Sequence, residues 1–419
     1  MTTTIDNEQK TLNVPNLRFK EFQGEWENCK VSELLDFYST NSLSWDKLEY
    51  GTNAIQNLHY GLIHVGLPTM VDLDNDKLPN IVSGNTPKNY ELCQEGDIAF
   101  ADASEDTNEV AKAVEFYNLN GKDVICGLHT IHGRDNQHKT IVGYKGYAFS
   151  STAFHNQIRR IAQGTKIYSI NNKNFSECYI GIPSKGEQKK IATLLRLIDE
   201  RISTQNKIIE DLKKLKSAIS KYLFERKDLF ENKIKLSKVA ELKNGYAFQS
   251  SKYNALGKWK ILTIANVAGE RYVKTNECNS IIEIPYDIQK HQKLEANDIL
   301  ISLTGNVGRV SLCTEGFFLL NQRVGLLQLK ISENREFIYQ VLSFHKFEES
   351  MIACAQGAAQ MNIGKGDVEN YILPYSFNKE NINSVASVLK NYDKYIINEI
   401  NMLSMLHSQK QYLLRQMFI

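Results

Sequence analysis

Apolar residues recur at helical spacing through a central stretch of the chain, residues 184–226. The stretch opens at Ser184 and Glu187 with the Ser-x-x-Glu pattern of a capping box, in which each side chain accepts a hydrogen bond from the other residue's backbone. After Gly186 no Pro or Gly occurs until Gly245. The pattern predicts one helix of roughly 55–60 Å, which cannot bury its own apolar stripe. Read as heptads, its seam comprises Ile191, Ile198, Gln205, Leu212 and Ile219 at one position and Leu194, Arg201, Ile208, Leu215 and Tyr222 at the other.

The C-terminal end of the chain repeats this helix. Residues 385–418 align without a gap on residues 191–224, and most stripe positions stay apolar. The identical pairs include Ala192/Ala386, Leu195/Leu389, Asp199/Asp393, Ile202/Ile396, Leu212/Leu406, Lys216/Lys410 and Phe224/Phe418. Chance rarely preserves periodic and non-periodic positions together, so the chain is an internal repeat and the second helix is the expected partner of the first. The residues expected to pair are Ile191, Leu194, Ile198, Leu212, Leu215 and Ile219 with Val388, Tyr392, Leu406 and Leu413.

Short runs of β-type residues, bounded by turn residues, fill the remainder of both halves. The repeat continues here at lower identity, since residues 95–98 resemble residues 296–299. Each half is therefore expected to be a mixed α/β globule that ends in a long helix, within an α+β chain of pseudo-twofold design. The expected divisions are a disordered segment over 1–13, a first globule over 14–183, a long helix over 184–228, a second globule over 229–376 and a long helix over 377–419.

The two halves keep their ends and diverge in their middles. An aromatic-rich lead segment, residues 14–26, opens the first half, and its Phe and Trp side chains are expected to dock on a core. Similar ends with different middles are typical of a shared scaffold that carries two different recognition surfaces.

Composition excludes several classes of protein. A hydrophobic content of 42% suffices for ordinary cores, and no run approaches the length of a membrane span. The N-terminus is polar and carries no signal-peptide pattern, and the seven cysteines are scattered without a C-x-x-C. These features favour a soluble cytoplasmic protein with free thiols over a disulfide-stabilised or zinc-binding one. The net charge is only +2, so any nucleic-acid surface must come from local patches.

No catalytic constellation is evident. The sequence lacks the Asn-Pro-Pro-Tyr or Asp-Pro-Pro-Tyr motif of an adenine methyltransferase, a glycine-rich fingerprint for a methyl donor, and a GxxxxGK[ST] phosphate loop. His129 and His132 form an H-x-x-H pattern without an evident third ligand, which favours ordinary loop or DNA-facing roles over a metal site. Asp97 and Asp298 each precede an apolar strand, which favours a turn role over catalysis. We therefore predict no catalytic residue, metal or cofactor in this chain.

Four segments in a fixed order carry a resemblance to a known family: PNLRFKEFQGEW, GEQKKIATLLRLIDERI, NGYAFQSSKY and the C-terminal LLRQMF. With them the chain resembles, over essentially its whole length, the specificity subunit of Type I restriction–modification systems. The resemblance implies that each globule is a target-recognition domain for one half of a bipartite DNA site. It also implies that the two helices pair antiparallel as a coiled-coil spacer. Two modification (adenine methyltransferase) subunits and restriction subunits are then expected as partners, and S-adenosylmethionine, ATP and Mg²⁺ are expected on those partners.

DNA contacts are expected from polar loop residues, because Arg and Lys bind guanine edges, Asn and Gln bind adenine edges, and all four bind phosphates. In the first globule the candidates are His129, Thr130, Arg134, Arg159, Arg160, Gln163 and Lys166. In the second they are Ser250, Ser251, Lys252, Thr304, Asn306, Arg309, Gln322, Arg323, Gln356, Gln360 and Asn362. The glycines of residues 303–308 leave room for backbone N–H groups to approach a phosphate, and a plain hairpin turn explains them equally well. The lysines expected on the solvated face of the central helix are Lys189, Lys190, Lys207, Lys213, Lys214, Lys216 and Lys221.

Two other interpretations stay open at this point. The first is a fused nuclease or methyltransferase, which the missing motifs disfavour and a methylation assay on the isolated chain would detect. The second is a structural coiled-coil protein that assembles partners without reading DNA. The divergent, loop-rich middles disfavour it, and a DNA-shift assay in the presence of the modification subunit would distinguish it.

Overall fold

The computed structural model describes residues 13–330, 334–356 and 361–419. Residues 1–12 of the segment predicted to be disordered lie outside this range. The chain divides into two compact units: the first comprises Met1–Gln205 and Met402–Ile419, and the second comprises Asn206–Asn401. Each unit therefore contains one globule and a part of each long helix. Among the described residues, no helix is both long and apolar enough to cross a membrane.

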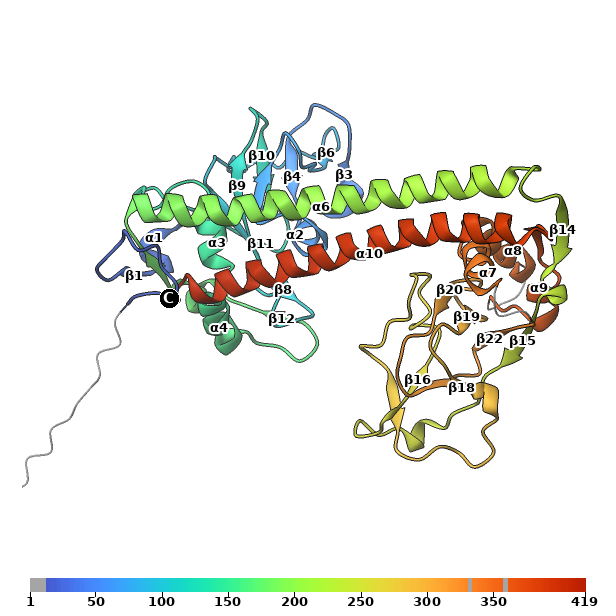
Figure 1. Cartoon of the computed structure of the whole chain (residues 1–419). Helices are drawn as coiled ribbons and strands as arrows, with labels where there is room; N and C mark the ends of the chain where they lie inside the picture. Colours follow the sequence, from blue (N-terminus) through green and yellow to red (C-terminus); the bar gives the residue numbers. More distant parts are fainter. Residues whose placement is uncertain (1–12, 331–333, 357–360) are drawn as a thin grey trace, which may run out of the picture. The chain divides into compact units, whose positions relative to one another are not determined.

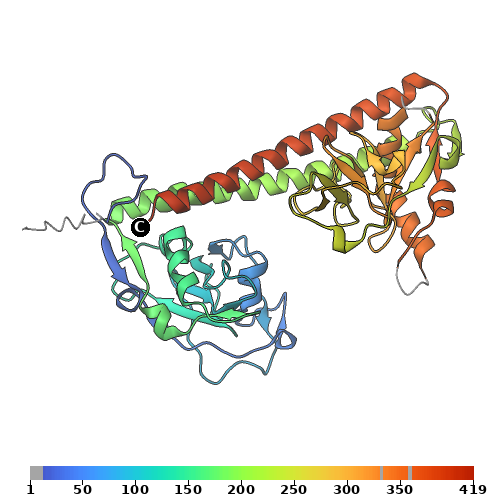
Figure 2. The same cartoon turned by 90° about the horizontal axis from the view of Figure 1, so that it is seen from below.

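Two long helices form as predicted: α6 (Lys185–Glu225, 41 residues) and α10 (Lys379–Gln416, 38 residues). In the first unit the start of α6 lies beside the end of α10 (Figure 1). In the second unit the end of α6 lies beside the start of α10 (Figure 2). The helices therefore run antiparallel in each unit, which confirms the predicted helix pair.

Burial identifies the seam of α6. Ile191, Leu195, Ile198, Gln205 and Ile209 are all buried. They are separated by four, three, seven and four residues, and half-buried Ile202 fills the gap of seven, so the positions repeat every seven residues as in a coiled coil. The first predicted heptad position is therefore correct. The second lies one residue later than predicted, in the row 195, 202, 209 and 216.

Two of the predicted pairing residues are wrong because of this shift. Leu215 and Val388 are 46% and 44% exposed. Leu194 and Leu195 are both apolar, so the sequence does not show which of the two belongs to the buried row. The correct row also contains Lys216, which sequence reasoning places in solvent. The remaining predicted pairing residues are buried (Ile191, Ile198 and Leu413) or half-buried (Leu194, Leu212, Ile219, Tyr392 and Leu406).

The first unit builds its globule around two main sheets. One runs in the order β2-β11-β7-β9-β5 and the other in the order β10-β4-β6-β3. The strands are β2 (Asp36–Tyr38), β3 (Leu48–Glu49), β4 (Gln56–Leu58), β5 (Met70–Asp72), β6 (Asn80–Ile81), β7 (Ile98–Ala101), β9 (Ala113–Asn118), β10 (Val124–Cys126) and β11 (Thr130–Arg134), with β8 (Ala103–Ser104) pairing β12 (Tyr168–Ser169). The short helices are α1 (Val31–Leu34), α2 (Tyr60–Val65), α3 (Lys145–Phe149), α4 (Thr152–Ile161) and α5 (Asn172–Ser176).

The second unit has a similar but smaller set of elements. Its sheets run in the orders β15-β22-β19-β20 and β17-β16-β21-β18. The strands are β15 (Ala240–Asn244), β16 (Trp259–Leu262), β17 (Asn279–Ile281), β18 (Lys293–Leu294), β19 (Ile299–Ser302), β20 (Val310–Leu312), β21 (Phe318–Leu320) and β22 (Val324–Leu329). The helices are α7 (Arg335–Leu342), α8 (His345–Ala355) and α9 (Lys365–Glu369).

The internal repeat is visible in the backbone. An antiparallel pair precedes each long helix: β1 (Glu27–Lys30) pairs with β13 (Tyr179–Ile182), and β14 (Asn232–Lys235) pairs with β23 (Ile372–Tyr375). The turns before β7 and β19 also match, since Gly96 and Asn297 have φ values of +86° and +68°. Glycine and asparagine are the residues that tolerate this left-handed conformation. The predicted α+β repeat is confirmed.

The lead segment docks on the first unit, as predicted. Trp26 is buried and packs edge-to-face on Phe418, with the ring centroids 6.5 Å apart. Glu187 donates its backbone N–H to Ser184 Oγ at 3.4 Å, which is one of the two hydrogen bonds of the expected capping box. Its carboxylate binds the Arg18 guanidinium at 2.7 and 2.8 Å. The start of α6 is thus fixed by a residue of the lead segment, a contact that sequence reasoning did not predict.

Candidate nucleic-acid interface

Two loops of the second unit meet where sequence reasoning places contact residues. The loop between β19 and β20, residues 303–309, lies against the segment that precedes α9. Gly305 donates its N–H to the Met361 carbonyl at 2.9 Å, and Thr304 Oγ1 donates to Asn362 Oδ1 at 3.1 Å. Gly305 has a φ of +74°, so the glycine serves the turn itself. Thr304 and Asn362 are therefore brought together, although they lie far apart in the sequence.

The turn between β21 and β22 continues this surface. Gln322 and Arg323 are both exposed in it. The Arg323 carbonyl accepts from the Leu303 N–H at 3.0 Å, and Gln322 donates its N–H to the Tyr246 carbonyl at 2.9 Å. We call the exposed or half-exposed residues of these loops the second loop face; it comprises Thr304, Asn306, Gln322, Arg323 and Asn362.

The other candidates of the second unit lie outside this face. Ser250, Ser251 and Lys252 are exposed on a short 3₁₀ turn beyond Tyr246. Lys252 and Ser251 line an open hollow of about 840 Å³, together with Tyr246, Phe248 and Tyr286 among others. Arg309 is half-buried, with Nε 3.3 Å from Glu348 Oε1, and Gln356 is exposed at the end of α8. Gln360 lies outside the described residues.

His129 is the most distinctive candidate of the first unit. Its φ is +56°, and its side chain is 51% exposed. Histidine tolerates this conformation better than branched or bulky residues do. Nδ1 lies 3.3 Å from Asp102 Oδ1, and the ring meets Tyr60 edge-to-face at 5.3 Å.

Four more candidates of the first unit are exposed on or just after α4. Arg159 donates to Asn108 Oδ1 at 2.8 Å, and Arg160 and Lys166 are exposed. Gln163 exchanges two backbone hydrogen bonds of 2.9 Å with Ser169. Ile170, which follows Ser169, donates its N–H to the Asp102 carbonyl, and Asp102 donates its N–H to the His129 carbonyl. These hydrogen bonds connect the segment after α4 to His129. The first loop face therefore comprises His129, Arg159, Arg160, Gln163 and Lys166.

One exposed aromatic residue near this face, Trp45, was not identified by sequence reasoning. Trp45 is exposed and stacks on His59 with a centroid distance of 4.5 Å, and His59 in turn lies 4.7 Å from Tyr60. Their position follows from the tertiary fold, because no periodic pattern marks residues 45–60.

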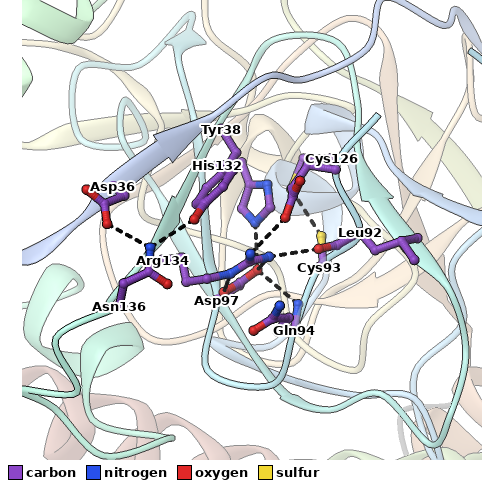
Figure 3. A network of polar contacts seen from close by, with 11 residues as sticks. Asp36, Tyr38, Leu92, Cys93, Gln94, Asp97, Cys126, His132, Arg134 and Asn136 are labelled. Carbon is purple, nitrogen blue, oxygen red and sulfur yellow. Dashed lines mark hydrogen bonds and ion pairs between the residues drawn. The ribbon is translucent and has the colours of Figure 1, made fainter. Parts of the chain in front are cut away.

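Thr130 and Arg134 are not surface residues. Both are buried in β11. Figure 3 shows the Arg134 side chain beside Asp97. Arg134 donates to both oxygens of Asp97 at 2.8 Å and to Glu91 Oε1 at 2.8 Å. Thr130 Oγ1 donates to the Gly127 carbonyl at 2.6 Å. Because their polar groups serve these internal contacts, we leave both out of the first loop face, contrary to the expectation that they contact DNA.

The turn role predicted for Asp97 and Asp298 is confirmed. Asp97 Oδ2 accepts from the Gln94 N–H at 2.9 Å, and Asp298 Oδ2 accepts from the Glu295 N–H at 2.8 Å. Burial raises the pKa of Asp298. Burial acts in the same direction on Asp97, but the hydrogen bonds from His132 and Arg134 outweigh it and leave its pKa lowered. Asp97 is therefore held as a carboxylate.

The two histidines of the H-x-x-H pattern do not share a site. His129 is exposed, whereas His132 is fully buried and bonds to Asp97. His132 lies instead beside two buried cysteines, Cys93 and Cys126. Burial raises the pKa of both thiols, but at Cys126 the hydrogen bond from Cys93 and the charges of His132 and Arg134 outweigh this and lower it.

Matching aspartates join each globule to the long helices. In the first unit Asp199 of α6 lies 2.7 Å from Lys410 Nζ of α10 and accepts from the Tyr147 hydroxyl of α3 at 2.9 Å. Asp199 thereby contacts both helices and the globule. Sequence reasoning identified the residue as part of the repeat but not this role.

Asp393 of α10 makes the equivalent contacts in the second unit; we call each such aspartate, with its partners on the other helix and on the globule, a joint. It accepts from Lys216 of α6 at 2.6 Å, from Arg271 at 2.8 Å and from Gln340 of α7 at 2.6 Å. Arg271 also forms two hydrogen bonds with Glu336. Lys216, predicted to be solvated, is instead half-buried in an ion pair. The other predicted helix lysines are exposed, and Lys214 pairs with Glu210 at 2.6 Å as expected from the i,i+4 spacing.

Fold and site together define an internally duplicated protein in which one helical frame carries two unlike loop faces. The sequence profile of a family described as Type I restriction modification DNA specificity domain matches twice, at residues 75–214 and 230–402. The two matches cover most of the chain, so the chain belongs to this family.

Relatives and a solved structure agree with this assignment. The putative Type I restriction enzyme MjaX specificity subunit of Methanocaldococcus jannaschii is 24% identical over 408 residues, 92% of this chain and 91% of that protein. The MjaVIII specificity subunit of the same organism is 28% identical over 261 residues, 56% of this chain and 60% of that protein. The crystal structure of the S subunit of a Type I restriction-modification system from M. genitalium has a TM-score of 0.56 at 16% identity, covering 97% of this chain and 99% of that one. This last likeness shows a shared fold.

Proposed function

We propose that this chain supplies the DNA sequence specificity of a Type I restriction–modification complex, with each loop face reading one half of a bipartite site. The main support is the contrast between joints and faces. The joints made by Asp199 and Asp393 are equivalent in the two units, whereas the two loop faces are built from different residues. A constant frame with two different polar faces suits a protein that reads two different short sequences.

The long helices set the distance between the two half-sites in this proposal. Each helix contributes to both units, so the number of helical residues between the joints determines how many base pairs stay unread. Half-site readers on one face of DNA lie about 34–36 Å apart per helical turn. The helices also provide the surface on which two modification subunits dock.

Catalysis belongs to the partner subunits in this proposal. Modification subunits bind S-adenosylmethionine and methylate adenine, and restriction subunits use ATP and Mg²⁺. This chain contributes recognition and assembly only. A methylation assay on the chain alone should give no product, while the chain together with its modification subunits should methylate DNA.

Exchanging one half of the chain tests the two-reader proposal directly. Replacing residues 1–185 with the corresponding part of a related chain should change one half of the methylated sequence and leave the other half unchanged, because each unit carries its own loop face. Sequencing of methylated bases in cells that express the hybrid with its modification subunit gives the result. If both half-sites change together, the two faces do not read independently.

Arg323 tests the second loop face at a single residue. Its guanidinium is exposed in the turn between β21 and β22. Arg323→Ala should weaken specific DNA binding by about 1–3 kcal/mol if the guanidinium reads a base, or lower the salt slope by about one ion if it binds a phosphate. Lys213→Ala, at an exposed position of α6, is the matched control and should change neither quantity. Equal behaviour of the two variants would remove Arg323 from the interface.

A further inference from the structure

A buried group of metal-binding side chains lies in the first unit (Figure 3). The sulfur atoms of Cys93 and Cys126 are 3.6 Å apart, and both lie within 4.8 Å of a ring nitrogen of His132. All three residues are buried. In the part of the chain that the structure describes, they are the one such group of three His, Cys, Asp or Glu side chains.

His132 is oriented as a metal-binding histidine would be. Its Nε2 lies 2.7 Å from Asp97 Oδ2, while its Nδ1 is buried without a hydrogen-bond partner. Asp97 accepts from Arg134 through both of its oxygens, so the ring nitrogen that faces it, Nε2, is the donor, and Nδ1 is the nitrogen left for a metal. A carboxylate behind the ring is the usual support of a histidine ligand, because it fixes the tautomer and the ring orientation. A buried nitrogen without a partner is otherwise costly.

The second unit shows how the same positions are filled by ordinary packing. Cys93 and Leu294 each lie four residues before the aspartate of the shared turn. His132 and Leu326 each pair with the strand residue two places after that aspartate. The strand register therefore matches a cysteine and the histidine of the first unit to two leucines of the second.

Cys126 follows the same rule. In the first unit Leu92, five residues before Asp97, pairs with Ile125, and Cys126 follows Ile125. In the second unit Lys293, five residues before Asp298, pairs with Leu319, and Leu320 follows Leu319. Leu294, Leu320 and Leu326 are all buried in a single hydrophobic cluster. At one place in the repeat, three leucines of the second unit thus correspond to two cysteines and a histidine in the first. Three changes to metal ligands at one point are more specific than a lone buried cysteine.

We propose that Cys93, Cys126 and the Nδ1 atom of His132 bind a zinc ion. Tetrahedral zinc with Zn–S bonds of about 2.3 Å places two sulfur atoms about 3.8 Å apart. The observed separation of 3.6 Å is close to this value. Two thiolates balance the charge of Zn²⁺, and the protons that they release pass to solvent. Arg134 balances Asp97, so the buried group as a whole carries no net charge, and water completes the tetrahedron.

Zinc at this position would stabilise the strands beneath the first loop face. Cys126 ends β10 and His132 lies in β11, so the ion joins the two strands on either side of the connection that carries His129. Cys93 adds the segment that bridges to β10. The ion thus has a structural role beneath a recognition loop, in a chain whose scattered cysteines gave no zinc motif.

Metal analysis of the full chain tests the proposal. The protein, purified without chelator and dialysed against Zn²⁺, should contain about one zinc per chain. Substitution by Co²⁺ should give thiolate-to-cobalt charge-transfer bands, which report sulfur ligation in the unaltered protein. Cys93→Ser and His132→Gln should each abolish these bands, whereas Cys178→Ser, at a buried cysteine outside the group, should retain them. Removal of zinc should lower the melting temperature of the unaltered protein.

A second pair of variants tests the supporting carboxylate and does not depend on removal of a ligand. Asp97→Asn should weaken zinc affinity by about 10- to 100-fold. Asp298→Asn changes the matching turn of the second unit and should leave the affinity unchanged. Absence of zinc and of cobalt–thiolate bands in the folded, unaltered protein would overturn the proposal. So would a Cys93–Cys126 disulfide, seen by mass spectrometry as the loss of two hydrogens without bound metal.

Discussion

Replacing Asp393 by alanine is expected to lower the free energy of unfolding of the second unit by about 3–5 kcal/mol. The side chains of Asp393 and Arg271 are only 8% and 7% exposed, and Lys216 and Gln340 share the same carboxylate. Removing the aspartate leaves a buried guanidinium with Glu336 as its remaining carboxylate partner, and desolvated charges without compensation are costly. Urea unfolding followed through Trp259, in a background with Trp26→Phe and Trp45→Phe, reports the second unit alone.

Two comparisons distinguish charge from packing at this joint. Asp199→Ala removes the equivalent carboxylate of the first unit, which loses hydrogen bonds to Tyr147 and Lys410, and should cost about 1–3 kcal/mol there. The double variant Arg271→Met with Asp393→Leu removes both charges and should recover most of the lost stability. If Asp393→Ala unfolds at the same urea concentration as the unaltered chain, this ion pair does not hold the globule to the helices.

Lengthening both long helices by one heptad is expected to lengthen the unread part of the DNA site by about three base pairs. Seven residues add about 10.5 Å to a helix, and base pairs rise about 3.4 Å each. The insertions belong after Lys207 and after Asn401, which are matching positions of the repeat. A heptad preserves the spacing of the buried seam in both helices. Sequencing of methylated bases should therefore show the two original half-sites with a longer gap.

Insertion into one helix alone is the control. Four residues added after Lys207 shift the seam of α6 against an unchanged α10, because the buried positions recur every seven residues. This variant should lose stability and methylation without producing a defined new gap. A paired heptad insertion that leaves the gap unchanged would show that the helices do not set the distance.

Much of the fold was predictable from the sequence because the repeat preserves two independent signals. The apolar stripe of residues 184–226 predicts the long helix α6. The gap-free alignment of residues 191–224 with residues 385–418 predicts its partner, α10. The exact seam was not predictable. Leu194 and Leu195 are equally apolar. Lys216 is a charged residue in the correct row, and only the ion pair with Asp393 explains why it lies between the helices. That partner lies 177 residues away in the sequence.

The candidate site was predictable only in part, because loop residues reveal their type but not their orientation. Asp97 and Asp298 were correctly placed in turns, since Asp before an apolar strand is a local pattern. Arg134 and His129 belong to the same stretch and have similar polarity, yet one is buried and one exposed. The spacing of Cys93 and Cys126 matches no short metal motif, and only strand pairing brings them together.

The reciprocal aspartate–lysine pairs bear on the ancestry of the chain. Each half contributes the acid of one pair and the base of the other: Asp199 with Lys410, and Asp393 with Lys216. A polypeptide that consisted of one half would carry both groups, and two copies of it would satisfy both pairs about a twofold axis. The two pairs are therefore those that a homodimer of one half would form, which is the pattern expected of a gene duplication followed by fusion. Fusion frees the two loop faces to diverge, because a change in one copy is no longer imposed on the other.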